Sequence, residues 1–284
     1  MATFYNQATL SYNGNTTTSN ITTGELVEVL SATKTAVQTE YQQDDTLTYV
    51  VNILNSGNTT MTGVTISDNL GAYTLNTITL VPMDYVVGTV RYYVGGVLQP
   101  TPTVTAGPPL TISGLSVPAK GNVTVIYQAK TNDYAPLAQE SSITNTATIN
   151  ANNIANPITA SATVNAYSEP VLRISKSLTP TTVSENGQLT YTFIIQNYGN
   201  TAADEAAALI VSDRFDPILN PITVAFNGTA WTEGTEYTYD ATTGQFVSTA
   251  GIITVPAASY TQDAATGAIS IVPGSATLTI TGTV

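Results

Sequence analysis

The stretch Thr46-Leu47-Thr48-Tyr49-Val50-Val51-Asn52-Ile53-Leu54 alternates polar and apolar side chains and ends in the turn Asn55-Ser56-Gly57-Asn58-Thr59. Alternation with a period of two predicts a half-buried β-strand, and Asn and Gly favour the turn that ends it. The pattern recurs downstream, where Leu189-Thr190-Tyr191 leads into Asn197-Tyr198-Gly199-Asn200-Thr201. A long internal repeat indicates one structural unit present twice. The sequence therefore predicts two copies of one β-structure.

The repeat extends well beyond these strands. Upstream, Ala32-Thr33-Lys34-Thr35 matches Ile174-Ser175-Lys176-Ser177, and downstream, Ile66-Ser67-Asp68 matches Val211-Ser212-Asp213. Many short strands separated by Gly- and Asn-rich turns are typical of a β-sandwich. We therefore expect an all-β chain of two tandem immunoglobulin-like β-sandwiches, preceded by an N-terminal donor-strand segment.

The composition excludes several classes of function. The 284 residues include no Cys and no His, which rules out disulfides, thiolate nucleophiles, Ser-His-Asp triads and the usual zinc ligands. The net charge of −12 argues against nucleic acid and anionic membrane as partners. No Gly-rich phosphate loop is present, so we expect no cofactor, and without Cys, His or EF-hand spacing we expect no metal. No run is long and apolar enough for membrane insertion, and the N-terminus has no features of a Sec signal peptide.

The two copies differ in their closing strands. The first copy continues into Ser142–Ile149 and then into 160–164, whereas the second has no such pair before Val284. A similar element stands at the start of the chain, because Phe4-Tyr5-Asn6-Gln7-Ala8-Thr9-Leu10 resembles Ile143-Thr144-Asn145-Thr146-Ala147-Thr148-Ile149. We therefore divide the chain into donor strands (1–28), a first sandwich (29–168) and a second sandwich without its last strands (169–284).

A sandwich without its last strands exposes unpaired backbone groups and an open core. Residues 1–28 can fold back onto their own second copy, complete the second copy of a neighbour, or remain a frayed tail. We favour the neighbour, because a fold-back must span the whole first copy, and head-to-tail contacts between identical molecules generate fibres. In this hypothesis the donated strand inserts Phe4, Asn6, Ala8 and Leu10.

Lysine is scarce, and two lysines occupy equivalent positions. Lys34, Asp68 and Asn145 form one predicted set, and Lys176, Asp213 and Asn6 of a neighbouring molecule form the other. A desolvated Lys becomes a nucleophile, and a protonated carboxyl group can polarise an Asn amide. The sets therefore predict self-crosslinking Lys–Asn isopeptide bonds. In the alternative, the lysines extend to solvent at a sheet edge and the aspartates shape turns.

Other candidate sites carry less weight. Asp44-Asp45 and the pair Asp213 and Asp216 lack EF-hand spacing, so turn formation explains them better than calcium binding. Tyrosines such as Tyr92-Tyr93, Tyr237 and Tyr239 are more typical of cross-strand pairs than of a glycan site. No paired-carboxylate cluster of the kind that glycoside hydrolysis needs is evident, so we do not expect an enzyme.

The motifs resemble those of the bacterial domain-of-unknown-function-eleven repeat family. The resemblance rests on Lys34-Thr35, Leu47-Thr48-Tyr49, Asn55–Thr59, Ser67-Asp68 and their counterparts in the second copy, and on the closing Asn145–Thr148 with Asn6–Thr9 as a variant. It implies a cell-surface or stalk-like protein. Two tandem copies of this size also look like the ribbon-appendage structural proteins of bacterial spores.

The sequence thus predicts a structural subunit of an extracellular fibre or spore-surface appendage, with other copies of itself as partner and an anchor protein that stays unidentified. The alternative is a monomeric cell-surface adhesin or stalk module that binds glycan or a host protein.

Overall fold

A computed structural model of the chain describes residues 2–26, 29–152, 154 and 156–284. The prediction of an all-β chain is confirmed, since the only helical element in the described residues is one 3-10 turn at Glu205–Ala207. Two separate hydrophobic cores divide the structure, one in residues 29–166 and one in residues 172–284. We call these units domain 1 and domain 2.

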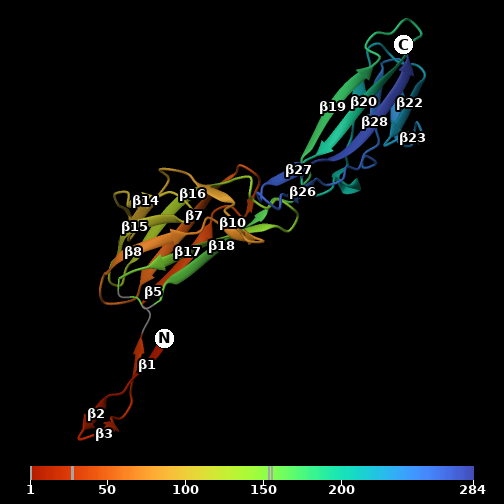
Figure 1. The fold of residues 1–284 in the computed structure, drawn as a ribbon. Helices are drawn as coiled ribbons and strands as arrows, with labels where there is room; N and C mark the ends of the chain where they lie inside the picture. The colour runs from red at the N-terminus through yellow and green to blue at the C-terminus, as the bar shows by residue number, and fades with distance from the viewer. Residues whose placement is uncertain (1, 27–28, 153, 155) are drawn as a thin grey trace.

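Domain 1 is a sandwich of two sheets (Figure 1). The first sheet has the order β13 (Val97–Leu98), β12 (Arg91–Val94), β16 (Asn122–Thr131), β7 (Thr46–Asn55) and β5 (Leu30–Ala36), with β11 (Met83–Tyr85) also on β16. The second has the order β14 (Thr103–Thr105), β15 (Leu110–Val117), β8 (Met61–Asp68), β17 (Ser142–Asn150), β18 (Ile158–Ala166) and β6 (Glu40–Tyr41). A small hairpin joins β9 (Tyr73–Leu75) to β10 (Ile78–Leu80).

Alternation along the strands fills the interior of domain 1. On β7 the side chains of Tyr49, Val51 and Ile53 are buried while their neighbours are less so, and β16 alternates in the same way. Every second residue of a strand points to the same face, so these strands present one apolar face to the core. The same rule places the inward residues of β17 at Ile143, Asn145, Ala147 and Ile149.

Domain 2 repeats this plan with fewer strands. Its larger sheet has the order β19 (Leu172–Thr179), β20 (Gln188–Asn197), β28 (Gly274–Thr283), β22 (Ile222–Phe226) and β23 (Thr229–Trp231). Its smaller sheet has the order β21 (Ser212–Arg214), β25 (Gln245–Ser248) and β24 (Tyr237–Asp240), and a hairpin of β26 (Ser259–Gln262) and β27 (Ile269–Val272) stands apart.

The registers show which strands correspond. Asp68 on β8 pairs with Leu110 on β15, and Asp213 on β21 pairs with Phe246 on β25. The opposite edge of β8 carries β17, but the described residues provide no strand on that edge of β21. Domain 2 therefore has no counterpart of β17 and β18 in the part of the chain that the structure describes.

The repeated Asn-x-Gly-Asn-Thr turn has a structural explanation. The Asn55 amide donates to the carbonyl oxygens of Thr59, Val117 and Pro118, and its oxygen accepts from the backbone of Gly57. The Asn197 amide makes the corresponding bonds to Thr201, Pro256 and Gly199. A buried amide whose donors and acceptor are all used fixes the turn, which explains why both copies use Asn here.

Residues 2–26 form a separate arm that pairs with itself. β1 (Ala2–Asn6) pairs with β4 (Thr22–Leu26), and β2 (Thr9–Tyr12) pairs with β3 (Asn15–Thr18). The single strand that we expected over 4–10 is therefore interrupted at Gln7-Ala8. There the Ser19 backbone N–H donates a hydrogen bond to the Ala8 carbonyl, and the Ala8 backbone N–H donates one to the Ser19 hydroxyl. Figure 1 shows this arm (red) at one end of domain 1 and domain 2 (green to blue) at the other.

The hairpin of β26 and β27 joins the two domains. The Gln262 side chain donates to the Tyr73 hydroxyl over 2.7 Å, and the Ile269 backbone donates to the Asp133 carbonyl over 3.0 Å. Figure 1 shows the hairpin between the two sandwiches. These bonds tie a domain 2 element to domain 1 and favour an extended arrangement.

Candidate cross-linking site

Lys34 lies on β5 with its amine inside domain 1. It faces Val51 across the strand pair, and none of its side chain is exposed. Its Nζ lies 2.5 Å from Asp68 Oδ2 and 4.9 Å and 5.8 Å from the ring centres of Tyr49 and Tyr127. β5 is an edge strand, but the Lys34 side chain does not extend to solvent. The alternative interpretation, in which this lysine extends to solvent at a sheet edge, is therefore wrong for Lys34.

Asp68 is the last residue of β8 and is also fully buried. Its Oδ2 accepts from the Tyr127 hydroxyl over 2.5 Å in addition to Lys34, and its Oδ1 accepts from the Leu70 backbone over 3.0 Å. The carboxyl group therefore holds the amine and the phenol together.

Asn145 lies on β17 and points into the same cluster. Its Nδ2 donates to the Tyr127 hydroxyl over 3.2 Å, while its Oδ1 is buried without a hydrogen-bond partner in the described structure. An unpaired buried carbonyl costs about 1–3 kcal/mol, and sites that retain this cost call for an explanation. Domain 1 thus places Lys34 and the Tyr127 hydroxyl on the same oxygen of Asp68, with Asn145 bonded to that hydroxyl.

Sequence reasoning missed Tyr127. The strands that carry Lys34 and Asn145, β5 and β17, belong to different sheets and face each other across the interior. Tyr127 was detectable in principle, because it is an inward residue of the alternating stretch 123–129. Which inward residues meet across a sandwich depends on sheet packing, and the period of two does not encode it.

Burial changes the chemistry of this cluster. Desolvation lowers the pKa of Lys34 to about 8, although the charge of Asp68 and its hydrogen bond oppose the shift. Burial also raises the pKa of Tyr127 well above its usual value, so its hydroxyl stays protonated as a donor. A neutral amine can attack the Asn145 amide carbon, with Asp68 carrying the proton and ammonia leaving.

The lowered pKa predicts a pH dependence of stability. In Asn145→Ala, where no bond can form, Lys34 stays titratable. Because its folded pKa of about 8 lies below its usual 10.5, the unfolded chain binds more protons between these values, and stability rises with pH. We expect the free energy of unfolding to rise by about 1 kcal/mol per pH unit above about pH 8, until tyrosine ionisation opposes it near pH 10.

Urea denaturation of domain 1 across this range measures the slope. The control is Asn145→Ala combined with Lys34→Met, which removes the titrating amine and should remove the rise. Equal slopes in both variants would show that Lys34 is not the desolvated group.

Domain 2 contains half of the corresponding set. Lys176 on β19 forms an ion pair with Asp213 on β21, but their side chains are 38% and 20% exposed. Ile280 on β28 stands opposite Tyr191, where domain 1 has Tyr127 opposite Tyr49. Asn6 lies on β1, which pairs with β4 rather than with domain 2. The described structure of one molecule therefore does not bring Asn6 to Lys176.

The face of domain 2 around this pair is open and apolar. Ile174 on β19 is 57% exposed, whereas Ala32 at the corresponding position in domain 1 is partly buried in its core. In domain 1 the cover comes from β18, which packs across β5. Phe4 and Leu10 on the N-terminal arm are likewise 57% and 63% exposed. One molecule thus carries an uncovered sheet face at one end and uncovered apolar side chains at the other.

The other predicted candidates have structural roles. Asp44 pairs with Lys130 at 2.7 Å, and Asp45 caps the backbone of Gln42. Tyr92 bonds the Ser116 backbone, and Tyr237 stacks obliquely on Phe246. Within the described residues no group of three acidic side chains is placed to hold a metal ion. No helix among them has the length and apolar character to cross a membrane.

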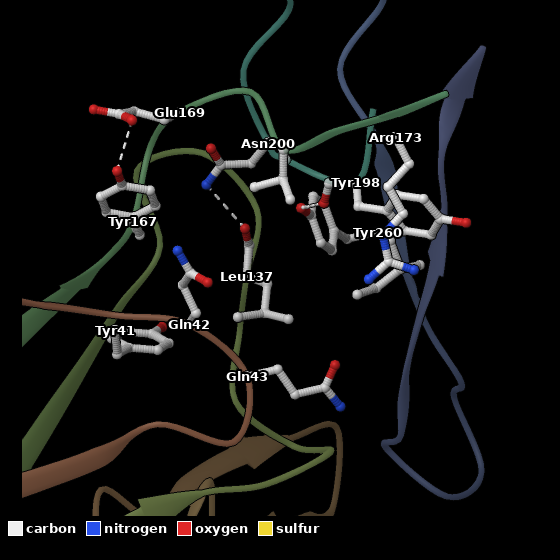
Figure 2. A pocket seen from close by; sticks show the side chains of 13 residues that line it. Tyr41, Gln42, Gln43, Leu137, Tyr167, Glu169, Arg173, Tyr198, Asn200 and Tyr260 are labelled. Carbon is white, nitrogen blue, oxygen red and sulfur yellow. Dashed lines mark hydrogen bonds between the residues drawn. The ribbon is translucent and has the colours of Figure 1, made fainter. Parts of the chain in front are cut away.

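A cavity of about 330 Å³ lies where the two domains meet (Figure 2). Tyr41, Gln42 and Gln43 line it from domain 1, and Tyr198 and Tyr260 line it from domain 2. Its polar groups are largely used within the protein: Tyr260 donates to the Tyr198 carbonyl, and Asn200 donates to the Leu137 carbonyl. Since the second bond links the two domains, we interpret the cavity as part of their junction.

Comparison with known proteins gives a distant likeness only. No protein-family model and no curated protein matches the chain, so the family resemblance rests on the quoted motifs. The pilus backbone RrgB of Streptococcus pneumoniae is 15% identical with a TM-score of 0.36, covering 86% of this chain and 55% of its own. BcpA, the major pilin subunit of Bacillus cereus, is 12% identical with a TM-score of 0.37, covering 96% and 73%.

A family 123 glycoside hydrolase from Clostridium perfringens also matches, at 10% identity and a TM-score of 0.32, covering 49% of this chain and 27% of its own. This chain thus spans about half the length of the pneumococcal pilin. The chain therefore has only a distant structural similarity to these major pilins.

Proposed function

We propose that the protein is a structural subunit of an extracellular fibre or spore-surface appendage, and that each molecule donates its N-terminal arm to domain 2 of the next. One observation carries the proposal. Domain 2 lacks counterparts of β17 and β18 in the described structure, and the arm of residues 2–26, with its strand pairs β1–β4 and β2–β3, carries the side-chain pattern of β17 at residues 4–10.

The pattern match is position by position. The inward residues of β17 are Ile143, Asn145, Ala147 and Ile149, all buried in domain 1. At the same spacing the arm carries Phe4, Asn6, Ala8 and Leu10, all exposed. Apolar side chains that are exposed in the free chain gain about 25 cal/mol per Å² when buried, so a matching open face is a favourable destination.

The register of domain 1 specifies the contact. Ala147 pairs with Asp68 and Thr148 pairs with Ser67. Transferred to domain 2, this register sets Ala8 opposite Asp213, Thr9 opposite Ser212 and Leu10 opposite Val211. The exposed edge of β21 then gains a full set of backbone partners, which is the usual basis of strand addition.

The shape of the molecule favours donation to a neighbour. The arm and domain 2 lie at opposite ends of domain 1 (Figure 1). A contact between different surfaces of identical molecules continues from one copy to the next and produces a filament. Lys–Asn isopeptide bonds then reinforce the fibre, within domain 1 through Lys34 and Asn145 and between molecules through Lys176 and Asn6.

Two neighbouring substitutions test the donated face. Leu10→Asp is expected to weaken assembly at least about 100-fold, because it buries an unpaired charge. Ser11→Asp adds the same charge at the adjacent, outward position and should assemble normally. Electron microscopy and sedimentation of the full chain separate the outcomes.

Loss of fibres in both variants would indicate a general charge effect rather than an inserted face. A wild-type chain that stays monomeric at high concentration would instead favour the adhesin alternative.

A further inference from the structure

The two lysine–aspartate pairs have the same strand positions but differ in how far they are buried. In domain 1 both side chains are completely buried, and in domain 2 the amine and the carboxylate both contact solvent. A solvated amine keeps its proton and is a poor nucleophile, whereas a desolvated one loses it more readily. Because the Lys34 amine is buried and the Lys176 amine is not, we expect the two amines to differ in nucleophilicity.

The domain 2 site already has one apolar wall. Lys176 Nζ lies 4.3 Å from the ring centre of Tyr191 and 5.4 Å from those of Phe193 and Phe215. These rings exclude water from one side of the amine, while the other side stays open. One further apolar layer would complete its burial.

In domain 1 that layer and the reacting amide come from the same place. β17 supplies Asn145, and β17 together with its partner β18 covers the Lys34 cluster. The two halves of the N-terminal arm, β1 with β2 and β3 with β4, correspond to this pair, with Asn6 at the position of Asn145. Docking of the arm would therefore deliver the amide and remove the water in one step.

We propose that docking of the neighbour's arm converts the Lys176–Asp213 ion pair from an inert site into a bond-forming one, so that covalent locking occurs only between correctly assembled subunits. This inference rests on the proposed strand donation and adds its regulation.

The reaction balances without a co-reactant. On burial, a proton moves from Lys176 Nζ to the Asp213 carboxylate, which leaves a neutral amine and a carboxylic acid. The amine attacks Asn6 Cγ while Asp213 protonates the amide oxygen. The intermediate then collapses: the proton on its oxygen returns to Asp213 as the carbonyl re-forms, the Cγ–Nδ2 bond breaks, and Nδ2 leaves as ammonia with the proton released from Nζ. One amine and one primary amide give one secondary amide and one ammonia.

This order protects assembly from errors. In the free chain Asn6 and Lys176 are both exposed, so chance encounters between them occur in water, without the desolvation that makes an amine a nucleophile. A misplaced arm dissociates again, because no bond has formed. A correctly placed arm is retained permanently.

The experiment uses the full-length Leu10→Asp chain, which keeps Lys176, Asp213 and Asn6 but cannot donate its own arm. The probe is a synthetic peptide of residues 1–28 with the natural sequence. We expect the chain alone to form no intermolecular bond at concentrations too low for its weakened arm to dock, and the peptide to give a one-to-one adduct lighter than the sum by about 17 Da, the ammonia expelled by the amine.

Matched variants separate docking from chemistry. The Asn6→Ala peptide should bind and compete with the natural peptide without forming an adduct. In the chain, Lys176→Met should abolish the adduct, and Asp213→Asn should slow it at least about 100-fold while binding persists. Lys176 is partly exposed, so its replacement leaves folding intact.

Each outcome has one meaning. Binding of the natural peptide without an adduct overturns this inference and leaves strand donation standing. No binding at all overturns the strand donation itself. Covalent multimers of the Leu10→Asp chain without added peptide would show that the site reacts without docking, and would overturn the control by assembly.

Discussion

Deletion of residues 1–28 is expected to abolish fibre formation and to leave a soluble monomer. The deletion removes the arm that supplies the missing strands, so the edge of β21 and the face around Ile174 stay open. An open edge leaves backbone groups without partners and apolar surface in water, each of which costs free energy. Domain 2 should therefore melt at a lower temperature in the monomer than in the wild-type fibre.

Calorimetry and electron microscopy measure both effects. The melting of domain 1 serves as the internal control, because its own β17 and β18 complete it. Added peptide of residues 1–28 should raise the melting temperature of domain 2. Fibres that persist after the deletion would mean that another surface drives assembly.

Replacement of Asn145 by Ala is expected to have the largest effect on the stability of domain 1. An Asn145–Lys34 bond would close a long loop, and a cross-link across about 100 residues stabilises a fold by about 4–5 kcal/mol. Its loss should lower the melting temperature by on the order of 10–20 °C. The wild-type mass should lie below the sequence mass by about 17 Da, the ammonia lost, and Asn145→Ala should show no such deficit.

The matched control is Asn150→Ala, which changes the same residue type at an exposed position of the same strand. It should keep both the mass deficit and the stability. A wild-type domain 1 with its full sequence mass would rule out the bond, whatever the melting temperatures show.

The repeat in the sequence carried most of the information about the candidate site. Equivalent lysines and aspartates in the two copies of the repeat indicated Lys34, Asp68, Lys176 and Asp213. Strand periodicity also gave the inward positions of the strands, because a half-buried strand must alternate.

Contacts between distant segments were beyond this reasoning. The Tyr127 hydroxyl, which bridges Asp68 and Asn145, depends on how two sheets stack. The break of the arm at Ala8 depends on a bond to Ser19, and the junction between domains depends on Gln262 meeting Tyr73. The two residues of each pair lie far apart in the sequence, so the periodicity of a single strand does not predict their contact.

The central claim is that the arm of one molecule pairs with β21 of the next. Thr9→Cys and Ser212→Cys in one chain test it directly, because the register of domain 1 sets these residues opposite each other and the protein has no other Cys. In a chain that also carries Lys176→Met, so that no isopeptide bond can join the subunits, oxidation should give a ladder of disulfide-linked multimers on a non-reducing gel, collapsing to monomer on reduction. A monomer with an internal disulfide, or no disulfide at all, would contradict the claim.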